Sequence, residues 1–310
     1  MNARYNELLN YLPAHLKIIL EKTAERVGDD LLEIRVRCGL PLIIVTSNGC
    51  FAVMEDGSVS PAVGGAYVVN ENDLRQIFHA ICENSVYAYT DDIKQGFITV
   101  KGGHRVGFSG RTVTDGSRIE NFREISSMNI RIAREVIGAA NYIIDKVVHP
   151  AGIVSTLIVS PPMQGKTTVL RDLARQISDK GFKTALVDDR GELAALFRGV
   201  PQNDIGVQTD VIENAPKGQA ALMMLRTMSP QLIVTDEIST KEDAQALLQC
   251  FGTGVSVIAS AHGSSAREIM CRENLKPLLG GVGFKQIIVL NKEGFGLNTK
   301  VLGNVTVLEQ

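Results

Sequence analysis

The spacing of hydrophobic residues changes near residue 135, and this change divides the chain into two predicted domains. The first part combines helical spacing with short runs in which apolar and polar residues alternate. Helices are predicted at 5–27, with Pro13 opening a second helix, and at 73–82; strands are predicted at 32–37, 42–45, 112–113 and 127–132, with a glycine-centred hairpin at 96–111. We therefore predict a smaller α+β domain over residues 1–134, with a mostly antiparallel sheet.

Beyond residue 135, continuous apolar runs alternate with segments of helical spacing. Strands are predicted at 154–159, 183–187, 232–237, 255–262 and 284–290, helices at 136–148, 167–178, 219–228 and 241–251, and a closing hairpin partner at 301–308. Such alternation is typical of a mostly parallel sheet with helices on both faces. Ligands of open sheets of this kind bind outside the carboxyl ends of the strands, so polar residues that follow a strand are candidates for a site.

The first of these strand ends carries the motif around which the chain is organised. The sequence across the turn from strand to helix is Ser160-Pro161-Pro162-Met163-Gln164-Gly165-Lys166-Thr167-Thr168. A strand, a loop, Gly-Lys-Thr and a helix make the layout of a phosphate-binding P-loop. Backbone N–H groups at the helix start would surround a β-phosphate, and Gly165 lets the backbone approach it. Lys166 would contact the β- and γ-phosphates of ATP, and the Thr167 hydroxyl would bind Mg²⁺.

The predicted nucleotide-binding residues are therefore Pro162, Met163, Gln164, Gly165, Lys166, Thr167 and Thr168. The motif is incomplete, because Ser160 replaces its first glycine. Pro161 and Pro162 also remove two N–H donors from the early loop. A chance Gly-Lys-Thr in an ordinary strand–helix turn is the alternative interpretation.

Acidic residues follow two other predicted strands. Asp236 and Glu237 end the strand at 232–237 and resemble a Walker B element. We expect Asp236 to bind the Mg²⁺ ion and Glu237 to orient or activate the attacking water. The alternative for these acids is helix N-capping, where aspartate is also favoured. Asp189 and Glu192, with Asp188, could polarise water or bind metal, or could simply cap the loop and pair with Arg190.

His262 follows the strand at 255–262 and precedes Gly263. Its position at a strand end is consistent with a sensor of the γ-phosphate. A lone histidine with only a structural role is the alternative. Together with the P-loop and the two acidic segments, His262 makes four polar groups predicted at one edge of the sheet.

Arginine is frequent on the predicted strands of the first domain. These arginines are Arg35, Arg37, Arg105, Arg111, Arg123, Arg131 and Arg134. A bare electrostatic surface would accept lysine equally well, whereas a guanidinium group presents a fixed fork to phosphate. The two interpretations are a solvated sheet face and a surface that contacts anions.

Composition excludes several classes of protein. The chain of 310 residues is long enough for two domains, and no apolar run reaches the length of a membrane span. The net charge of −2 gives no support for strong nucleic-acid binding, so no nucleic-acid partner is expected. Five scattered cysteines without a C-x-x-C pair predict reduced thiols in a cytoplasmic protein. No basic start with an apolar core follows the N-terminus, so we expect no signal peptide.

The order of motifs resembles that of the secretion-type ATPases of type II and type IV secretion and pilus machines. Those proteins have a P-loop, an acidic box, a Walker B element with a catalytic glutamate and a histidine box, and the matching segments here are 160–168, 188–192, 236–237 and 261–263. The segment 224–230 before Walker B is similar to their Leu-Arg…Pro segment. Ser239 stands where many of them carry arginine, and Gln231 replaces their usual aspartate, which puts nucleotide affinity and turnover in question.

Nearly the whole chain resembles the stage III sporulation protein AA family of endospore-forming bacteria. The segments that carry this resemblance are Val187–Glu192, Gly103–Arg111, Asn129–Glu135 and the Ser-Pro-Pro variant of the P-loop. The resemblance implies a mother-cell ATPase, peripheral to the septal or engulfing membrane, that serves membrane-embedded components of a channel to the forespore. It also implies a hexameric ring in which arginines of the first domain reach nucleotide, and Arg105, Arg111 and Arg131 match those positions.

We therefore predict a RecA-like P-loop ATPase domain over residues 135–310, with a mostly parallel α/β sheet, preceded by the α+β domain. ATP hydrolysis would move one domain against the other at a hinge near residues 135–140. Two other functions stay open. One is a nucleic-acid-dependent translocase, and the other is a nucleotide-binding assembly protein with little turnover.

Overall fold

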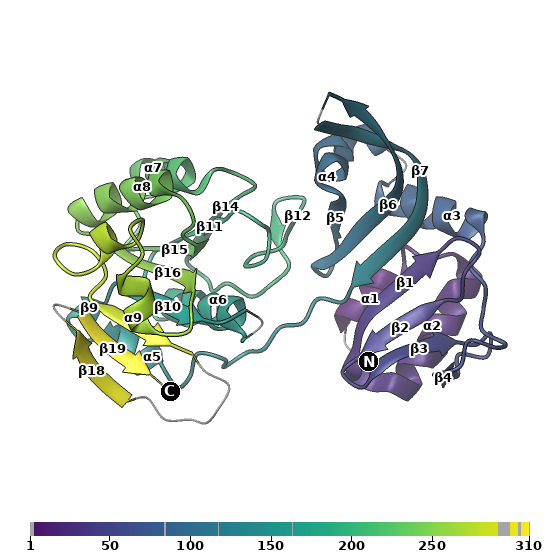
Figure 1. Cartoon of the computed structure of the whole chain (residues 1–310), viewed down its shortest axis with the longest axis horizontal. Coiled ribbons are helices and arrows are strands. Elements are labelled where there is room, and N and C mark those ends of the chain that lie inside the picture. Colours follow the sequence, from purple (N-terminus) through teal and green to yellow (C-terminus); the bar gives the residue numbers. More distant parts are fainter. Residues whose placement is uncertain are drawn as a thin grey trace. The chain divides into compact units, whose positions relative to one another are not determined.

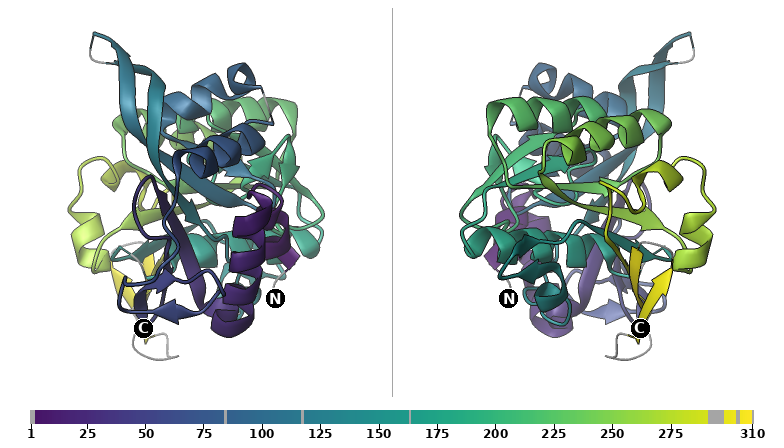
Figure 2. Two further views of the ribbon diagram at one scale, coloured as in Figure 1. Left: turned by 90° about the vertical axis from the view of Figure 1, so that its right-hand side faces the viewer. Right: turned by 90° about the vertical axis from the view of Figure 1, so that its left-hand side faces the viewer.

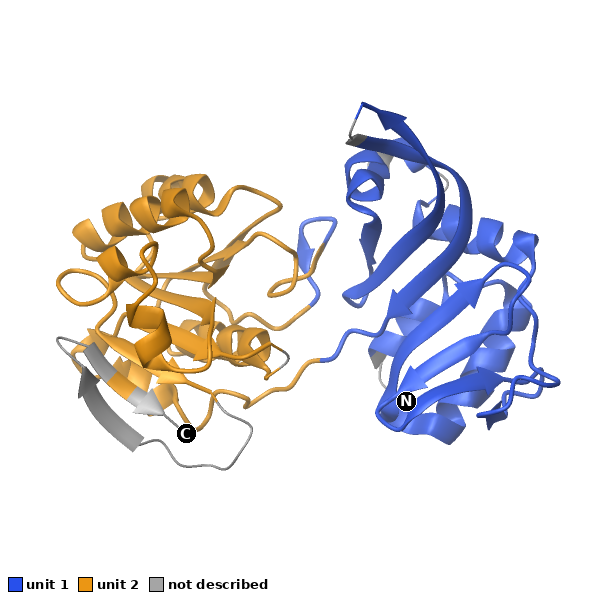
Figure 3. Ribbon diagram, viewed as in Figure 1, with its two compact units in different colours: residues 1–134, 197–202 blue, residues 135–196, 203–310 orange. Residues whose placement is uncertain are grey.

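The computed structural model of the protein describes residues 3–83, 85–116, 118–162, 164–290, 298–302 and 305–309. The chain divides into two compact units, which Figure 3 shows in different colours. Unit 1 comprises residues 1–134 and 197–202, and unit 2 comprises residues 135–196 and 203–310. The segment 197–202 thus belongs to unit 1, although its place in the sequence is inside the predicted second domain.

Unit 1 contains, among the described residues, a seven-stranded sheet in which neighbouring strands are antiparallel. The strand order is β4-β3-β2-β1-β7-β6-β5 (Figure 1). The strands are β1 Leu31–Arg37, β2 Ile43–Thr46, β3 Gly49–Val53, β4 Val59–Ser60, β5 Phe97–Val100, β6 His104–Asp115 and β7 Arg118–Arg131. The helices are α1 Ala3–Leu9, α2 Ala14–Val27, α3 Glu71–Ile81 and α4 Thr90–Gln95, with 3₁₀ turns at Gly28–Asp30 and Val86–Tyr89.

Alternation along β1 gives this sheet one apolar and one polar face. Ile34 and Val36 are fully buried, whereas Arg35 between them is exposed. The apolar face packs against the helices through Leu8, Leu16, Leu20, Leu74 and Ile77. Burying each such side chain contributes roughly 1.5–3 kcal/mol, so the helices hold this face and leave the arginine face uncovered by them.

Strands β6 and β7 form a ribbon that is longer than predicted. The separate strand expected at 112–113 is the outer part of β6. Three register shifts interrupt the pairing of the two strands, and bulges of this kind increase the local twist. The outer part of the ribbon projects past the helices of unit 1 (Figure 2).

Unit 2 contains an eight-stranded sheet in the order β14-β11-β15-β16-β10-β17-β19-β18. Within the described residues its pairs are parallel except for β18 with β19. These strands are β10 Thr156–Ser160, β11 Thr184–Asp188, β14 Thr209–Glu213, β15 Leu232–Glu237, β16 Ser256–His262, β17 Gln286–Val289, β18 Asn298–Leu302 and β19 Val305–Glu309. Two small two-stranded sheets pair β8 Val148–His149 with β9 Gly152–Ile153, and β12 Leu196–Phe197 with β13 Val200–Pro201. The predicted mostly parallel α/β sheet is confirmed.

Helices cover both faces of this sheet, because successive strand residues point to opposite sides. Leu157 and Val159 belong to the core that includes α7 and α8, which lie side by side in Figure 2, whereas Ile158 belongs to the core around α6. The helices are α5 Ile144–Val147, α6 Lys166–Asp179, α7 Lys217–Thr227, α8 Lys241–Gly252 and α9 Ala266–Met270, with a 3₁₀ turn at Lys276–Leu278. Burial on both faces explains why these strands are continuously apolar in sequence.

The helix predicted at 136–148 is wrong for most of its length. Helix α5 covers only its last part, and turns precede it. Gly138 has a φ of +84°, a left-handed conformation that interrupts a right-handed helix. The Ala140 N–H donates to Asp172 Oδ2 at 2.8 Å, so a tertiary hydrogen bond holds the segment in place of helical ones.

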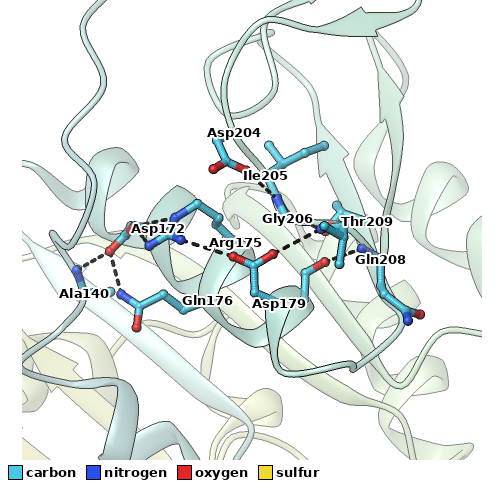
Figure 4. Close-up of polar contacts among 12 residues, drawn as sticks. Ala140, Asp172, Arg175, Gln176, Asp179, Asp204, Ile205, Gly206, Gln208 and Thr209 are labelled. Atoms are coloured by element: carbon cyan, nitrogen blue, oxygen red, sulfur yellow. Dashed lines mark hydrogen bonds and ion pairs between the residues drawn. The ribbon is translucent and has the colours of Figure 1, made fainter.

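Asp172 is the centre of a polar network on α6 (Figure 4). Its buried carboxylate accepts hydrogen bonds from Ala140 N, from Nε and Nη2 of Arg175, and from Gln176 Nε2, at 2.8–2.9 Å. Burial acts to raise the pKa of Asp172, but these hydrogen bonds outweigh burial and leave the pKa below its ordinary value. The network ties α6, the helix that follows the P-loop, to the segment before α5.

Candidate functional site

The loop between β10 and α6 has the geometry of a phosphate-binding turn. Gly165 precedes the helix with a φ of +80°, a conformation that glycine adopts without strain. A Cβ at this position would meet no atom within 4 Å, so the backbone angle rather than lack of space requires glycine. The first N–H groups of α6 have no partner within the helix, and they carry partial positive charge. Met163, one of the predicted loop residues, lies outside the described residues.

Lys166 is the first residue of α6, and its side chain is buried. Its exposed fraction is 7%, and its Nζ has no hydrogen-bond partner among the described residues. Burial lowers the pKa of Lys166, while the charges of Glu237 and Asp236 act in the opposite direction. A buried ammonium group without a hydrogen bond is costly, and an anion at the helix N-terminus would supply the missing partner.

Strand β15 brings Asp236 and Glu237, the two predicted Walker B acids, to the same edge of the sheet. Its register with β16 shifts between Thr235 and Glu237, so the backbone bulges where the acids lie. Asp236 is 4% exposed, and its Oδ1 accepts a hydrogen bond of 3.1 Å from Ser260 Oγ. The negative charges of Glu237 and Asp236 both raise the pKa of Lys166, so the two acids and the lysine interact electrostatically as one group.

His262 ends β16 and lies directly opposite Ser160 of β10. Its Nε2 is 3.2 Å from Glu237 Oε2. Its Nδ1 is buried and has no hydrogen-bond partner within the described part of the chain. The described residues therefore satisfy only one side of the ring.

The acidic residues at the end of β11 and after it differ in how deeply they are buried. Asp188 is fully buried and accepts hydrogen bonds from the N–H groups of Glu192, Leu193 and Ala194 at 2.8–2.9 Å. Burial raises the pKa of Asp188, and these three N–H groups oppose the increase. Asp188 thus caps the following loop, as the alternative interpretation expected, and it holds Glu192 through the main chain. Asp189 is 40% exposed at the rim of the site.

Lys217, which the sequence analysis did not select, joins the two acidic segments. Its side chain is 8% exposed, its Nζ donates to the main-chain oxygen of Glu237 at 2.6 Å, and the same atom lies 3.5 Å from Asp189 Oδ2. The positive charge of Lys217 also lowers the pKa of Lys166. The sequence contains one signal for it: a lysine in the first turn of a helix opposes the helix dipole and needs an anionic partner.

The predicted arginines lie on the strands of unit 1. Arg105 of β6 and Arg131 of β7 are directly opposite each other. The Arg105 guanidinium lies 4.3 Å from the centre of the Phe97 ring, and Arg131 pairs with Glu33 at 3.6 Å. Arg111 is exposed farther along the ribbon. These three residues belong to unit 1, whereas the P-loop and the acids belong to unit 2.

A comparison with protein families matches residues 2–304 to the family described as "Sporulation stage III, protein AA". The chain belongs to this family. Its relatives include the Stage III sporulation protein AA of Bacillus subtilis (strain 168), which is 36% identical over 293 residues, or 93% of this chain and 91% of the relative. Protein SEEDLING PLASTID DEVELOPMENT 1 of Arabidopsis thaliana is 26% identical over 70% of this chain and 30% of its own length. The resemblance to the sporulation family is confirmed.

Solved structures of ATPases resemble the fold of this family member. The pilus retraction motor PilT with bound ADP has a TM-score of 0.57 at 15% identity, with 94% of this chain and 81% of PilT covered. The ATPase DotB of Legionella pneumophila has a TM-score of 0.56 at 16% identity, with 87% and 71% covered. At these identities the likeness shows the fold alone, an α/β domain with a mostly parallel sheet preceded by a smaller N-terminal domain.

The residues at this edge fit a nucleotide with Mg²⁺. The Nζ of Lys166, for which the described residues supply no hydrogen-bond partner, and the N-terminus of α6 suit the negative phosphates. Among the described residues, no group of three or more histidine, cysteine or acidic side chains is arranged to hold a metal ion. Mg²⁺ typically binds one or two protein oxygens together with substrate phosphates and water, so Thr167 and Asp236 would be sufficient protein ligands.

Proposed function

We propose that this protein is an ATP-hydrolysing motor or assembly ATPase that serves a secretion-like channel between mother cell and forespore during sporulation. The observation that carries the proposal is the buried ammonium group of Lys166 at the start of α6, which has no hydrogen-bond partner among the described residues and whose pKa the charges of Glu237 and Asp236 raise. Family membership and the fold shared with PilT and DotB support it.

In this proposal Glu237 orients the attacking water and accepts its proton as the water oxygen bonds to the γ-phosphorus. The bond from that phosphorus to the bridging oxygen breaks, and ADP and phosphate leave. Lys166 would stabilise the negative charge on the β- and γ-phosphates, and Thr167 and Asp236 would hold a Mg²⁺ ion, which would supply positive charge to offset that of the phosphates. His262 contacts Glu237 through one ring nitrogen, which leaves Nδ1 available to sense the γ-phosphate.

Arg105, Arg111 and Arg131 would contact nucleotide in an assembled hexameric ring and stabilise charge in the transition state. Asp189 and Glu192 would assist the water or the metal. The partners would be membrane-embedded components of the channel complex, with the protein on the mother-cell side of the septal or engulfing membrane. In the described part of the chain, no helix has both the length and the apolar character that crossing a membrane requires.

Phosphate release by the purified full-length chain, measured with Mg²⁺–ATP over a range of protein concentrations, tests the proposal. We expect release that rises with ring formation on a sizing column and that Lys166→Ala abolishes. Lys180→Ala is the matched control, because Lys180 is an exposed lysine at the other end of α6. Equal turnover by a folded Lys166→Ala variant contradicts the P-loop assignment.

The differences between the loop after β10 and a complete P-loop motif favour one other function. Ser160 turns its hydroxyl to the Pro161 carbonyl at 3.0 Å, and the prolines supply no N–H donors. A nucleotide-dependent assembly protein with little turnover would fit these features. ATP-dependent ring formation without phosphate release in the same assay would replace the motor proposal with this one.

A further inference from the structure

A groove of about 330 Å³ crosses the polar face of the unit 1 sheet, at β1, β7 and β6. Two rows of directly opposite residues line it: Arg35, Asn129 and Gly107 in one row, and Arg37, Ser127 and Ser109 in the other. The two arginines are separated by one residue on β1, so their Cα atoms are about 7 Å apart and their side chains leave the same face. Glycine and serine give the groove its depth, since they carry little side-chain volume.

The described residues around this groove do not neutralise its positive charge. Within the part of the chain that the structure describes, no carboxylate lies within ion-pair distance of Arg35 or Arg37. Glu33, the carboxylate two residues before Arg35 on the same face, is paired with Arg131. The groove therefore keeps a local charge of two guanidinium groups.

Two residues that line the groove each have a buried polar atom without a partner in the part of the chain that the structure describes. Arg37 Nε, a donor, and Asn129 Oδ1, an acceptor, have no hydrogen bond among the described residues. Buried donors and acceptors in folded proteins are nearly always paired, and each unpaired one is costly. Both residues line the same groove, so one ligand that accepts from Arg37 and donates to Asn129 would supply the partners that these side chains lack among the described residues.

We propose that this groove binds the phosphate group of a phosphorylated small molecule, at a site separate from the P-loop. A phosphate carries about −1.5 to −2 charge and three acceptor oxygens, which matches two guanidinium forks and two serine hydroxyls. A carboxylate has half that charge, and one guanidinium satisfies both of its oxygens. The Asn129 acceptor requires a hydroxyl or N–H on the ligand, and the volume lies at the lower end of that of small-molecule sites, about 300–1,000 Å³.

Binding of inorganic phosphate to the full-length Lys166→Ala variant tests this site, because that change removes phosphate binding at the P-loop. We expect calorimetry to show binding that Arg37→Gln and Arg35→Gln each weaken by about tenfold or more, since each removes charge-assisted hydrogen bonds. Arg35 is exposed, so its variant keeps the test valid where Arg37→Gln fails to fold. Arg123→Gln removes an exposed arginine of the same sheet and should leave binding unchanged.

Arg37→Lys keeps the charge and removes the fork, so it should weaken binding as well. The proposal is overturned where phosphate does not bind, where acetate binds as tightly, where Arg37→Lys binds like the parent, or where Arg123→Gln weakens binding equally. Titrations with AMP and with vesicles containing phosphatidic acid, each against the Arg35→Gln control, then identify the source of the phosphate. The P-loop proposal stands or falls separately, because ATP turnover of the Arg35→Gln chain without the Lys166 change is expected at the parental rate.

Discussion

Lys217 joins the two acidic segments through its contacts with Glu237 and Asp189, and we call these two contacts the clamp. The variant Lys217→Met tests what the clamp contributes, apart from the rest of the site. Methionine has similar length and no charge, so the change removes two contacts of the ammonium group without adding bulk. The first is the 2.6 Å hydrogen bond to the Glu237 carbonyl, and a bond with a charged donor contributes about 1.5–3 kcal/mol. The second is the 3.5 Å contact with Asp189, which is 40% exposed, so it contributes only about 0–1 kcal/mol.

Removing a buried ammonium group also relieves part of its desolvation cost, which offsets some of that loss. We therefore expect the free energy of unfolding of unit 2 to fall by about 1–3 kcal/mol. For a unit of this size, each kcal/mol lowers the melting temperature by roughly 2–4 °C. Differential scanning calorimetry of the full chain measures this, with the exposed Lys180→Met as the matched control.

Turnover should fall more than nucleotide affinity in Lys217→Met, because the lysine holds the main chain of Glu237, the acid that we propose orients the attacking water. Lys217→Arg should restore part of the turnover, since it keeps a cation beside Asp189. A Lys217→Met chain that melts and hydrolyses ATP like Lys180→Met would show that the clamp has no role. A chain that loses stability alone would show that the clamp is structural.

Changes at the acids of β15, at the arginines of unit 1 and at Asp172 each have a distinct expected result. Glu237→Gln should keep Mg²⁺–ATP bound and lower phosphate release by about 10²–10⁴-fold, because an amide cannot accept the proton of the attacking water. Asp236→Asn should instead weaken Mg²⁺–ATP binding in a titration. Phosphate release by Glu237→Gln at the parental rate would show that Glu237 is not the catalytic acid. Arg105→Ala and Arg131→Ala should lower turnover more than ATP affinity, and normal hydrolysis by both variants in an assembled ring would favour the solvated-face interpretation. Asp172 has a pKa below its ordinary value of 3.8, so its stabilising contribution is complete above that value and is lost as the pH falls through the folded-state pKa. Melting curves should therefore show Asp172→Asn to be less stable than the parent at neutral pH, with the difference shrinking in acid, and a difference that is constant with pH would contradict this.

The apolar pattern was sufficient for the fold class of both units, an α+β unit with a mostly antiparallel sheet and an α/β unit with a mostly parallel sheet. Strands buried on both faces read as continuous apolar runs, and β1 of unit 1 alternates because only one of its faces is covered. The prediction of a helix at 136–148 was wrong because it rested on the spacing of apolar residues within that segment alone. The left-handed conformation of Gly138 and the hydrogen bond from Ala140 N–H to Asp172 determine the backbone there instead. A tertiary hydrogen bond of this kind leaves no periodic signal in the sequence.

The sequence alone determined the family, the parallel sheet and the chemistry available at its edge, because the P-loop and the two acidic segments each follow an apolar strand. Only the tertiary structure decided which side chains meet. Lys217 reaches Glu237, 20 residues away in sequence, because α7 and β15 pack together in one core. The order of strands places His262 opposite Ser160, and the pairing of β1, β7 and β6 brings Arg37 to Ser127 and Ser109. These contacts join residues far apart in the chain, so they depend on strand order and register, which spacing along one segment does not encode.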